Sequence, residues 1–276
     1  LGALEHNPAG LAQLSNSQVS AMYVRWISDI QFASLAGAHV VPALGTVGFG
    51  WKMVDLGGGL LGSPKIEGSV KDLTASSHLL TGAWSRALRE DLFVGGGAEI
   101  LSEDIAGSAA AGFALNGGVL YTPVHGLNLG LAALNVGTVA AFEATKNGLP
   151  LTVKLSGAWK GLEGDFGQIV ASADFTWVPP AQDGWAPATA IGVEYWGRRY
   201  FAVRAGYAST DTDLSQLVGL SAGVGARWRS LRFDLAYAPF SGLGQAIRGA
   251  VNWEIWPLVT MPVPGSAVGE LRTLTG

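Results

Sequence analysis

The stretch Val218 to Tyr237, VGLSAGVGARWRSLRFDLAY, decides the fold. From Val218 to Trp228, apolar side chains at every second position alternate with glycine, serine and arginine. Residues 229–230 interrupt the pattern, and from Leu231 to Tyr237 the same alternation resumes. A period of two is the repeat of a β-strand, and two such runs joined by two residues are typical of a β-hairpin. The stretch therefore predicts two antiparallel strands with one apolar and one small or polar face.

Runs of this kind recur along the whole chain. They predict fourteen strands, near residues 17–27, 30–40, 43–56, 76–88, 92–102, 107–121, 127–138, 150–160, 167–178, 188–196, 199–208, 216–229, 231–239 and 245–256. A strand that crosses a membrane needs ~9–11 residues, and bacterial barrels have an even number of strands. The fold class predicted is therefore all-β, a 14-stranded antiparallel transmembrane β-barrel.

The composition supports a membrane location. Charged residues make up 14% of the chain and hydrophobic residues 49%, with a mean hydropathy of +0.31, whereas a soluble domain carries about 25% charged residues. Residues 105–142 contain no Asp, Glu, Lys or Arg. A membrane helix is the alternative there, but seven glycines and Pro123 favour two strands with a reversal at residues 122–126.

The connections between the predicted strands are alternately short and long, except that the first hairpin, at residues 28–29, is tight where a long loop is expected. Short periplasmic turns opposite longer external loops are typical of outer-membrane barrels, so we expect both ends of the barrel on the periplasmic side of a bacterial outer membrane. The alternative, a soluble β-sandwich or propeller, would need polar outward faces. Tryptophans near predicted strand ends are expected to form the interfacial aromatic belts: Trp84, Trp159, Trp177, Trp196, Trp228 and Trp256.

Several segments resemble the PorV/PorQ-like group of FadL-type outer-membrane barrels. Near the N-terminus, residues 7–12 read NPAGLA, a segment shared by FadL-type barrels and the PorV/PorQ group. The further matching segments are IGVEY at 191–195, VRAGY at 203–207, GLSAGVG at 219–225 and FDLAYA at 233–238, with LNVG at 134–137 and GLP at 148–150. The resemblance covers most of residues 1–256.

We expect three parts in the chain: the resemblance implies the luminal segment and the barrel, whereas the tail after Trp256 departs from barrels that end on an aromatic residue. Residues 1–16 would form a luminal segment, 17–256 the barrel and 257–276 a periplasmic tail. Asn7, Pro8 and Gly10 would belong to a partial plug, since Pro8 fixes its own φ and disfavours a helical conformation at Asn7. Compared with typical FadL transporters, we expect only part of the usual N-terminal hatch before NPAG and a shorter barrel, which makes a complete capture-and-release mechanism a weaker expectation.

The resemblance also implies two kinds of function. The first is a non-enzymatic accessory or structural role in an envelope or secretion assembly, with other envelope proteins bound through the tail. The alternative is uptake of a hydrophobic small molecule. Outer-membrane lipid is an expected partner in both cases. Nucleic acid is not, because the net charge of −4 comes without a basic run.

The alternation places eight charged side chains of the C-terminal half on the luminal face. They are Lys154, Asp174, Glu194, Arg204, Arg227, Asp234, Arg248 and Glu254, four positive and four negative. An uncompensated charge in a confined interior is costly, so we expect a structural lattice of opposite charges. The alternative is a selective polar pathway, which would favour an excess of one sign.

No catalytic, cofactor or metal site is expected. Cysteine is absent, and the four histidines are widely separated with no second ligand at metal-binding spacing. Residues 76–78, Ser-Ser-His, lack a placed acid, and no glycine-rich stretch matches a phosphate-binding loop. An enzyme of the barrel class, such as a lipase, is a distant third alternative.

Overall fold

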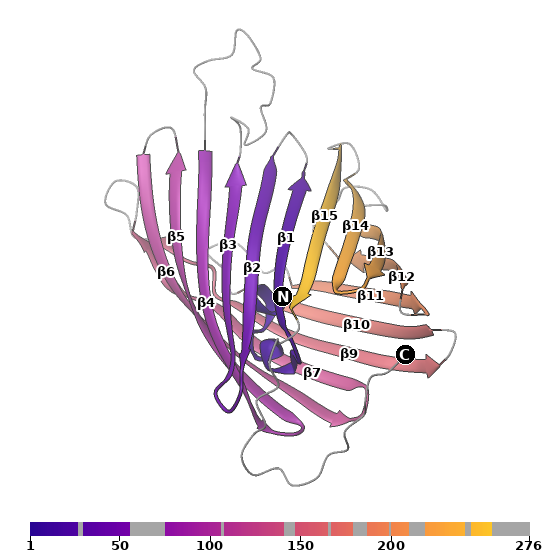
Figure 1. Ribbon diagram of the computed structural model, residues 1–276. Helices are drawn as coiled ribbons and strands as arrows, with labels where there is room; N and C mark the ends of the chain where they lie inside the picture. The colour runs from indigo at the N-terminus through magenta and orange to yellow at the C-terminus, as the bar shows by residue number, and fades with distance from the viewer. Residues whose placement is uncertain are drawn as a thin grey trace.

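The computed structural model describes a barrel of antiparallel strands with two short helices inside it (Figure 1). The residues described are 1–26, 30–55, 75–105, 108–140, 147–164, 167–178, 187–198, 200–209, 219–240 and 244–255. The predicted tail, residues 257–276, and Trp256 lie outside them.

Fifteen strands and two helices follow one another along the described chain. In order they are α1 (Ala3–His6), η1 (Pro8–Gln13, a 3-10 helix), β1 (Ser17–Arg25), β2 (Gln31–Val41), β3 (Gly45–Asp55), β4 (Ala75–Arg89), β5 (Leu92–Ile105), β6 (Ser108–Val124), β7 (Leu127–Ala140), β8 (Asn147–Gly148), β9 (Thr152–Gly164), β10 (Gly167–Trp177), β11 (Ala188–Gly197), β12 (Phe201–Ala208), β13 (Leu220–Trp228), β14 (Leu231–Phe240) and β15 (Gly244–Ile255). β8 is a two-residue strand beside β7, and the other fourteen are the predicted strands. The predicted all-β, fourteen-stranded fold is confirmed.

The ring closes because β1 pairs with β15, from Ser17 opposite Ile255 to Arg25 opposite Ile247. Every other spanning strand pairs with its neighbours in the sequence, always antiparallel. Closure pairs both edges of the sheet, which a membrane requires because lipid cannot hydrogen-bond an exposed edge. Both ends of the barrel chain lie beside the tight turns at residues 42–44, 90–91, 125–126 and 229–230; we refer to this rim as the short-turn end and to the opposite rim as the long-loop end.

The uncharged stretch 105–142 contributes two strands, β6 and β7, as predicted from its turn residues. The predicted reversal at 122–126 is too long, because β6 continues through Pro123 to Val124. The pairing of β6 with β7 shifts register between Tyr121 and Val124, and such an irregularity accommodates a proline that cannot donate to the ladder. No helix in the described part of the chain is long and apolar enough to cross a membrane.

The outward faces carry the large apolar side chains. Exposed examples from different strands are Phe49, Ile100, Phe113, Leu155, Val203 and Leu235. An apolar outer belt suits contact with lipid, whereas a soluble β fold would hide these side chains. Trp84, Trp159 and Trp228 are exposed on this outer face. The prediction for Trp196 is wrong: it is 7% exposed and faces the lumen, because Tyr195 takes the outward position and successive side chains alternate.

Candidate functional site

The N-terminal residues 1–14, which we name the inner segment, lie within the ring of strands (Figure 1). Its 3-10 helix η1 packs against the luminal faces of β3 to β6. Ala9 and Leu11 have no exposed surface, and Leu4 is 3% exposed. Leu4 and Leu11 form a small apolar core with Ala38 and Ala83 of the wall. This packing holds the inner segment against one side of the lumen.

Asn7 joins α1 and η1 and binds the wall. Its backbone is extended (φ −164°, ψ 104°), and its side-chain oxygen caps η1 by accepting from the Ala9 amide at 3.1 Å. Its Nδ2 donates to the carbonyl oxygens of Val119 at 3.0 Å and Leu131 at 3.3 Å. The amide thus satisfies an orphan donor of the helix and ties the segment to β6 and β7.

Four wall glycines leave room for the inner segment. A Cβ at Gly118 would lie 2.1 Å from the Asn7 Oδ1, and one at Gly95 would lie 2.5 Å from the Ala9 nitrogen. A Cβ at Gly48 would meet the Leu4 side chain at 2.8 Å, and one at Gly130 would lie 3.1 Å from the Asn7 Nδ2. We refer to Gly48, Gly95, Gly118 and Gly130 as the glycine seat. The alternation of side chains in the sequence does not single out these four glycines.

Three polar contacts connect the inner segment to β3, β7 and β9. Lys52 of β3 forms an ion pair with Glu5 at 2.8 Å, and the Lys154 Nζ lies 2.9 Å from the His6 Nδ1. The Gln13 amide donates to the Asn128 Oδ1 at 2.9 Å. Burial, and next the neighbouring Lys154 charge, lower the pKa of His6 below its ordinary value. His6 is therefore neutral at pH 7, and Lys154 donates to its Nδ1.

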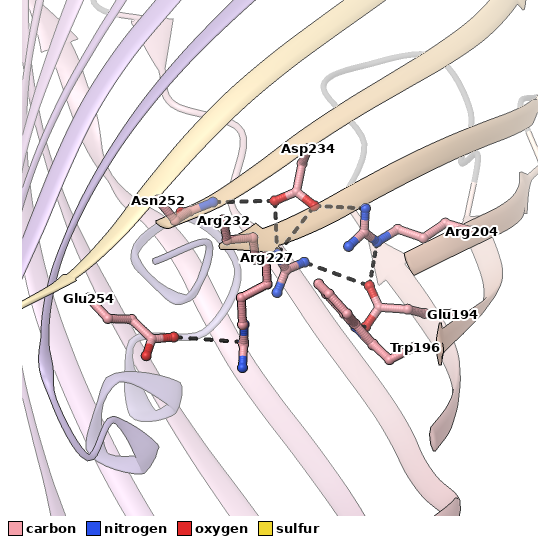
Figure 2. Close-up of polar contacts among 8 residues, drawn as sticks. All are labelled: Glu194, Trp196, Arg204, Arg227, Arg232, Asp234, Asn252 and Glu254. Carbon is pink, nitrogen blue, oxygen red and sulfur yellow. Dashed lines mark hydrogen bonds and ion pairs between the residues drawn. The ribbon is translucent and has the colours of Figure 1, made fainter. Parts of the chain in front are cut away.

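The opposite wall carries a cluster of charges around Trp196 (Figure 2). Arg204, Arg227 and Arg232 place their guanidinium carbons 5.6, 5.4 and 4.8 Å from the Trp196 ring centroid. The Trp196 Nε1 donates to Glu194 at 2.5 Å. Cation–π attraction in a partly desolvated site contributes about 1–2 kcal/mol per contact. Trp196 is thus the centre around which the arginines gather.

Carboxylates complete this cluster. Asp234 accepts from Arg204 at 2.8 Å, from Arg232 at 2.9 Å and from the Asn252 amide at 3.3 Å. Glu194 pairs closely with Arg204 and lies 3.7 Å from Arg232. We name the ionised residues the luminal charge network: Glu194, Arg204, Arg227, Arg232, Asp234 and Glu254. Its three positive and three negative charges cancel.

The eight predicted luminal charges do not all belong to this network. Glu194, Arg204, Arg227, Asp234 and Glu254 do. Lys154 instead binds the inner segment, and Asp174 and Arg248 form no ion pair within the described ranges. Sequence reasoning missed Arg232, although it is in phase with Asp234 two residues later. It also missed Lys52, which shares the luminal phase of Gly48 and Gly50 on β3.

A hollow of about 360 Å³ lies on the inner wall beside the network, between β10 and β14. The luminal side chains that line it are small, namely Ser172, Ser221 and Ala236, together with Gly192, Gly206 and Gly223. Val170 adds apolar surface, and the charged members of the lining, Glu194 and Arg204, pair with each other. The hollow is therefore electrically neutral and weakly polar. Among the residues described, no group of His, Cys, Asp and Glu could hold a metal ion.

Three solved structures with a similar fold are a transporter, a FadL homologue and a hydrocarbon channel. The toluene transporter TbuX of Ralstonia pickettii matches with a TM-score of 0.58 and 13% identity, over 92% of this chain and 93% of its own. A FadL homologue of Pseudomonas aeruginosa matches with 0.57 and 14%, over 91% and 93%. The monoaromatic hydrocarbon channel CymD matches with 0.59 and 12%, over 92% of each chain. No protein-family model matches the sequence, and no curated protein matches it.

These likenesses concern the fold. The chain has the architecture of FadL-type barrels, while the PorV/PorQ part of the sequence resemblance has no counterpart among these structures. The proteins matched are named as transporters and channels. Together with the closed fourteen-strand ring and the apolar outer belt, this architecture indicates a location in the bacterial outer membrane.

Proposed function

We propose that this barrel passes hydrophobic small molecules through the outer membrane, with the inner segment as a partial plug. Of the two functions implied by the sequence resemblance, the fold comparisons favour this one over the accessory role in an envelope assembly, because the matched proteins carry toluene or monoaromatic hydrocarbons. The observation that carries the proposal is the neutral hollow between β10 and β14.

The hollow has the size and chemistry of a small-molecule site. Its volume of about 360 Å³ lies within the ~300–1,000 Å³ of ligand pockets. Glycine, alanine and serine leave space beside the wall without placing a charge in it, and the adjacent charges neutralise one another. A neutral apolar compound therefore meets little polar surface that it would have to desolvate.

The charge balance argues against an ion pathway. A pore that selects ions presents rings of one sign, whereas Arg204 is held between Glu194 and Asp234. The inner segment fills the side of the lumen formed by β3 to β6. We infer that the passage runs along the opposite wall, between the inner segment and the hollow.

Toluene uptake into proteoliposomes tests this function. The purified barrel should raise the initial rate of uptake above that of protein-free vesicles, after subtraction of passive partitioning. A variant that carries both Ser172→Leu and Ser221→Leu should lose most of this increment, because the larger side chains fill the hollow. Val203→Leu, on the outward face of β12 and away from the hollow, is the matched control and should transport normally. Uptake no faster than in empty vesicles would reject the function.

A further inference from the structure

The inner segment is divided by Asn7 into a part fixed to the wall and a part that carries a titratable contact. On the C-terminal side of Asn7, η1 lies in the glycine seat with Ala9 and Leu11 fully buried. On the N-terminal side, α1 is a single turn held by Leu4, Glu5 and His6. The extended backbone of Asn7 separates the two helices.

The contacts of α1 reach two distant walls. Leu4 and Glu5 face β3, where a Cβ at Gly48 would touch Leu4 and where Lys52 pairs with Glu5 at 2.8 Å. His6 reaches β9, where the Lys154 Nζ lies 2.9 Å from its Nδ1. β3 and β9 are separated by β4, β5, β6 and β7 around the ring. The single turn of α1 therefore bridges the lumen between β3 and β9.

We propose that the hydrogen bond between His6 and Lys154 is an acid-sensitive latch, which closes the gap between the inner segment and the β9–β10 wall when His6 is neutral and opens it when His6 is protonated. This control of the lumen adds to the proposed function and does not depend on which compound passes.

Protonation of His6 would change the contact from attraction to repulsion. Neutral imidazole accepts a hydrogen bond at Nδ1, whereas imidazolium has a proton on both ring nitrogens and cannot accept one. It would also place a second cation 2.9 Å from the Lys154 Nζ, where like charges repel. The charged groups around His6 are Lys154 on β9, Asp174 on β10, Lys52 on β3 and Glu5 on α1 itself. Asp174 and Glu5 favour the protonated form, whereas burial and the two lysines oppose it.

The direction of the pH effect follows from this environment. The pKa of His6 in the docked state is lower than its ordinary value, with burial as the largest cause and Lys154 as the next. The undocked state consequently binds more protons than the docked state below about pH 6.5, the ordinary pKa of histidine. Docking of α1 is fully favoured above that pH and weakens as the pH falls towards the lowered pKa. Asn7 and the glycine seat contain no titrating group, so η1 should stay in place.

Planar-bilayer conductance between pH 7.5 and pH 4.5 tests the latch. We expect the wild-type conductance to rise severalfold as the pH falls, with a midpoint below 6.5. His6→Gln retains a side-chain acceptor for Lys154 but does not titrate, and it should stay at the low conductance throughout. His125→Gln, in the short turn between β6 and β7, is the matched histidine control and should behave like the wild type. A flat wild-type profile, or the same pH dependence in His6→Gln, would overturn the latch.

A spin label supplies a readout that is independent of transport. The chain contains no cysteine, so Gly2→Cys on the exposed start of α1 and Ser15→Cys after η1 can each be labelled at a single site. Acid should mobilise the label at Gly2 and leave the label at Ser15 unchanged, and His6→Gln should abolish the change at Gly2. Failure of toluene uptake with a mobile Gly2 label at low pH would reject the proposed function and keep the latch.

Discussion

Replacing Asn7 by alanine should release the inner segment from the wall. The Asn7 side chain is buried and forms three hydrogen bonds, to the Ala9 amide and to the carbonyl oxygens of Val119 and Leu131. The bond to the Ala9 amide lies within the inner segment, so two of the three bonds hold it to the wall. A buried hydrogen bond contributes a net ~1 kcal/mol, so the substitution should cost docking about 2 kcal/mol. At 1.4 kcal/mol for each factor of ten, the ratio of docked to undocked protein would fall about 30-fold.

Liposome swelling in an isotonic solution of a small sugar measures this loss, because an undocked segment leaves more of the lumen open. The Asn7→Ala protein should admit the sugar several times faster than the wild type, while it keeps the heat-modifiable mobility of a folded barrel on gels. Gln13→Ala is the matched control, since Gln13 is exposed and donates one hydrogen bond, to Asn128. Exposed contacts of this kind contribute little, so its swelling rate should stay close to that of the wild type.

Two results would refute the reasoning. If liposomes with the Asn7→Ala protein swell no faster than liposomes with the Gln13→Ala protein, then either Asn7 does not hold the inner segment or the position of this segment does not limit passage of the sugar. The spin label at Ser15 separates these two explanations, because it reports docking without any solute. An immobile label in the Asn7→Ala background would show that packing of Leu11 in the wall is sufficient by itself.

Two further substitutions test the seat and the charge network. Gly118→Ala should increase sugar permeability, because its Cβ would lie 2.1 Å from the Asn7 Oδ1. Gly117→Ala is the control and should leave the permeability unchanged, because no atom lies within 4 Å of the added Cβ. Equal swelling rates of liposomes with the two variants would contradict this prediction. Arg204→Ala should lower the free energy of unfolding by about 1–3 kcal/mol, since it leaves two partly buried carboxylates without their closest cation. Arg248→Ala is the control for Arg204→Ala. Urea titration of the heat-modifiable band measures the free energy of unfolding of both variants. An equal loss of this free energy in the two variants would argue against the network.

The strands and the direction of their side chains were predictable from the sequence. A strand repeats every two residues, and a slip of one residue would turn each apolar side chain from the lipid to the lumen. Runs such as Val218 to Trp228 therefore allow one orientation in a membrane. The same phase predicts that Glu194, Arg204 and Asp234 face inward, and it applies equally to Arg232, two residues before Asp234.

The contacts that form the candidate site were decided by closure of the ring. His6 and Lys154 are 148 positions apart, and Asn7 meets carbonyl oxygens 112 and 124 positions later in the chain. The alternation of side chains predicts whether a residue faces the lipid or the lumen. It does not predict how far along the barrel axis the residue lies, or which strand faces it across the lumen. Gly118 contacts Asn7, and Trp196 lies among three arginines, only because the closed ring brings these residues to the same height in the lumen. The sequence by itself thus determined which side chains share the lumen, and only the tertiary structure decided which of them touch, because contact depends on strand register and shear around the whole barrel.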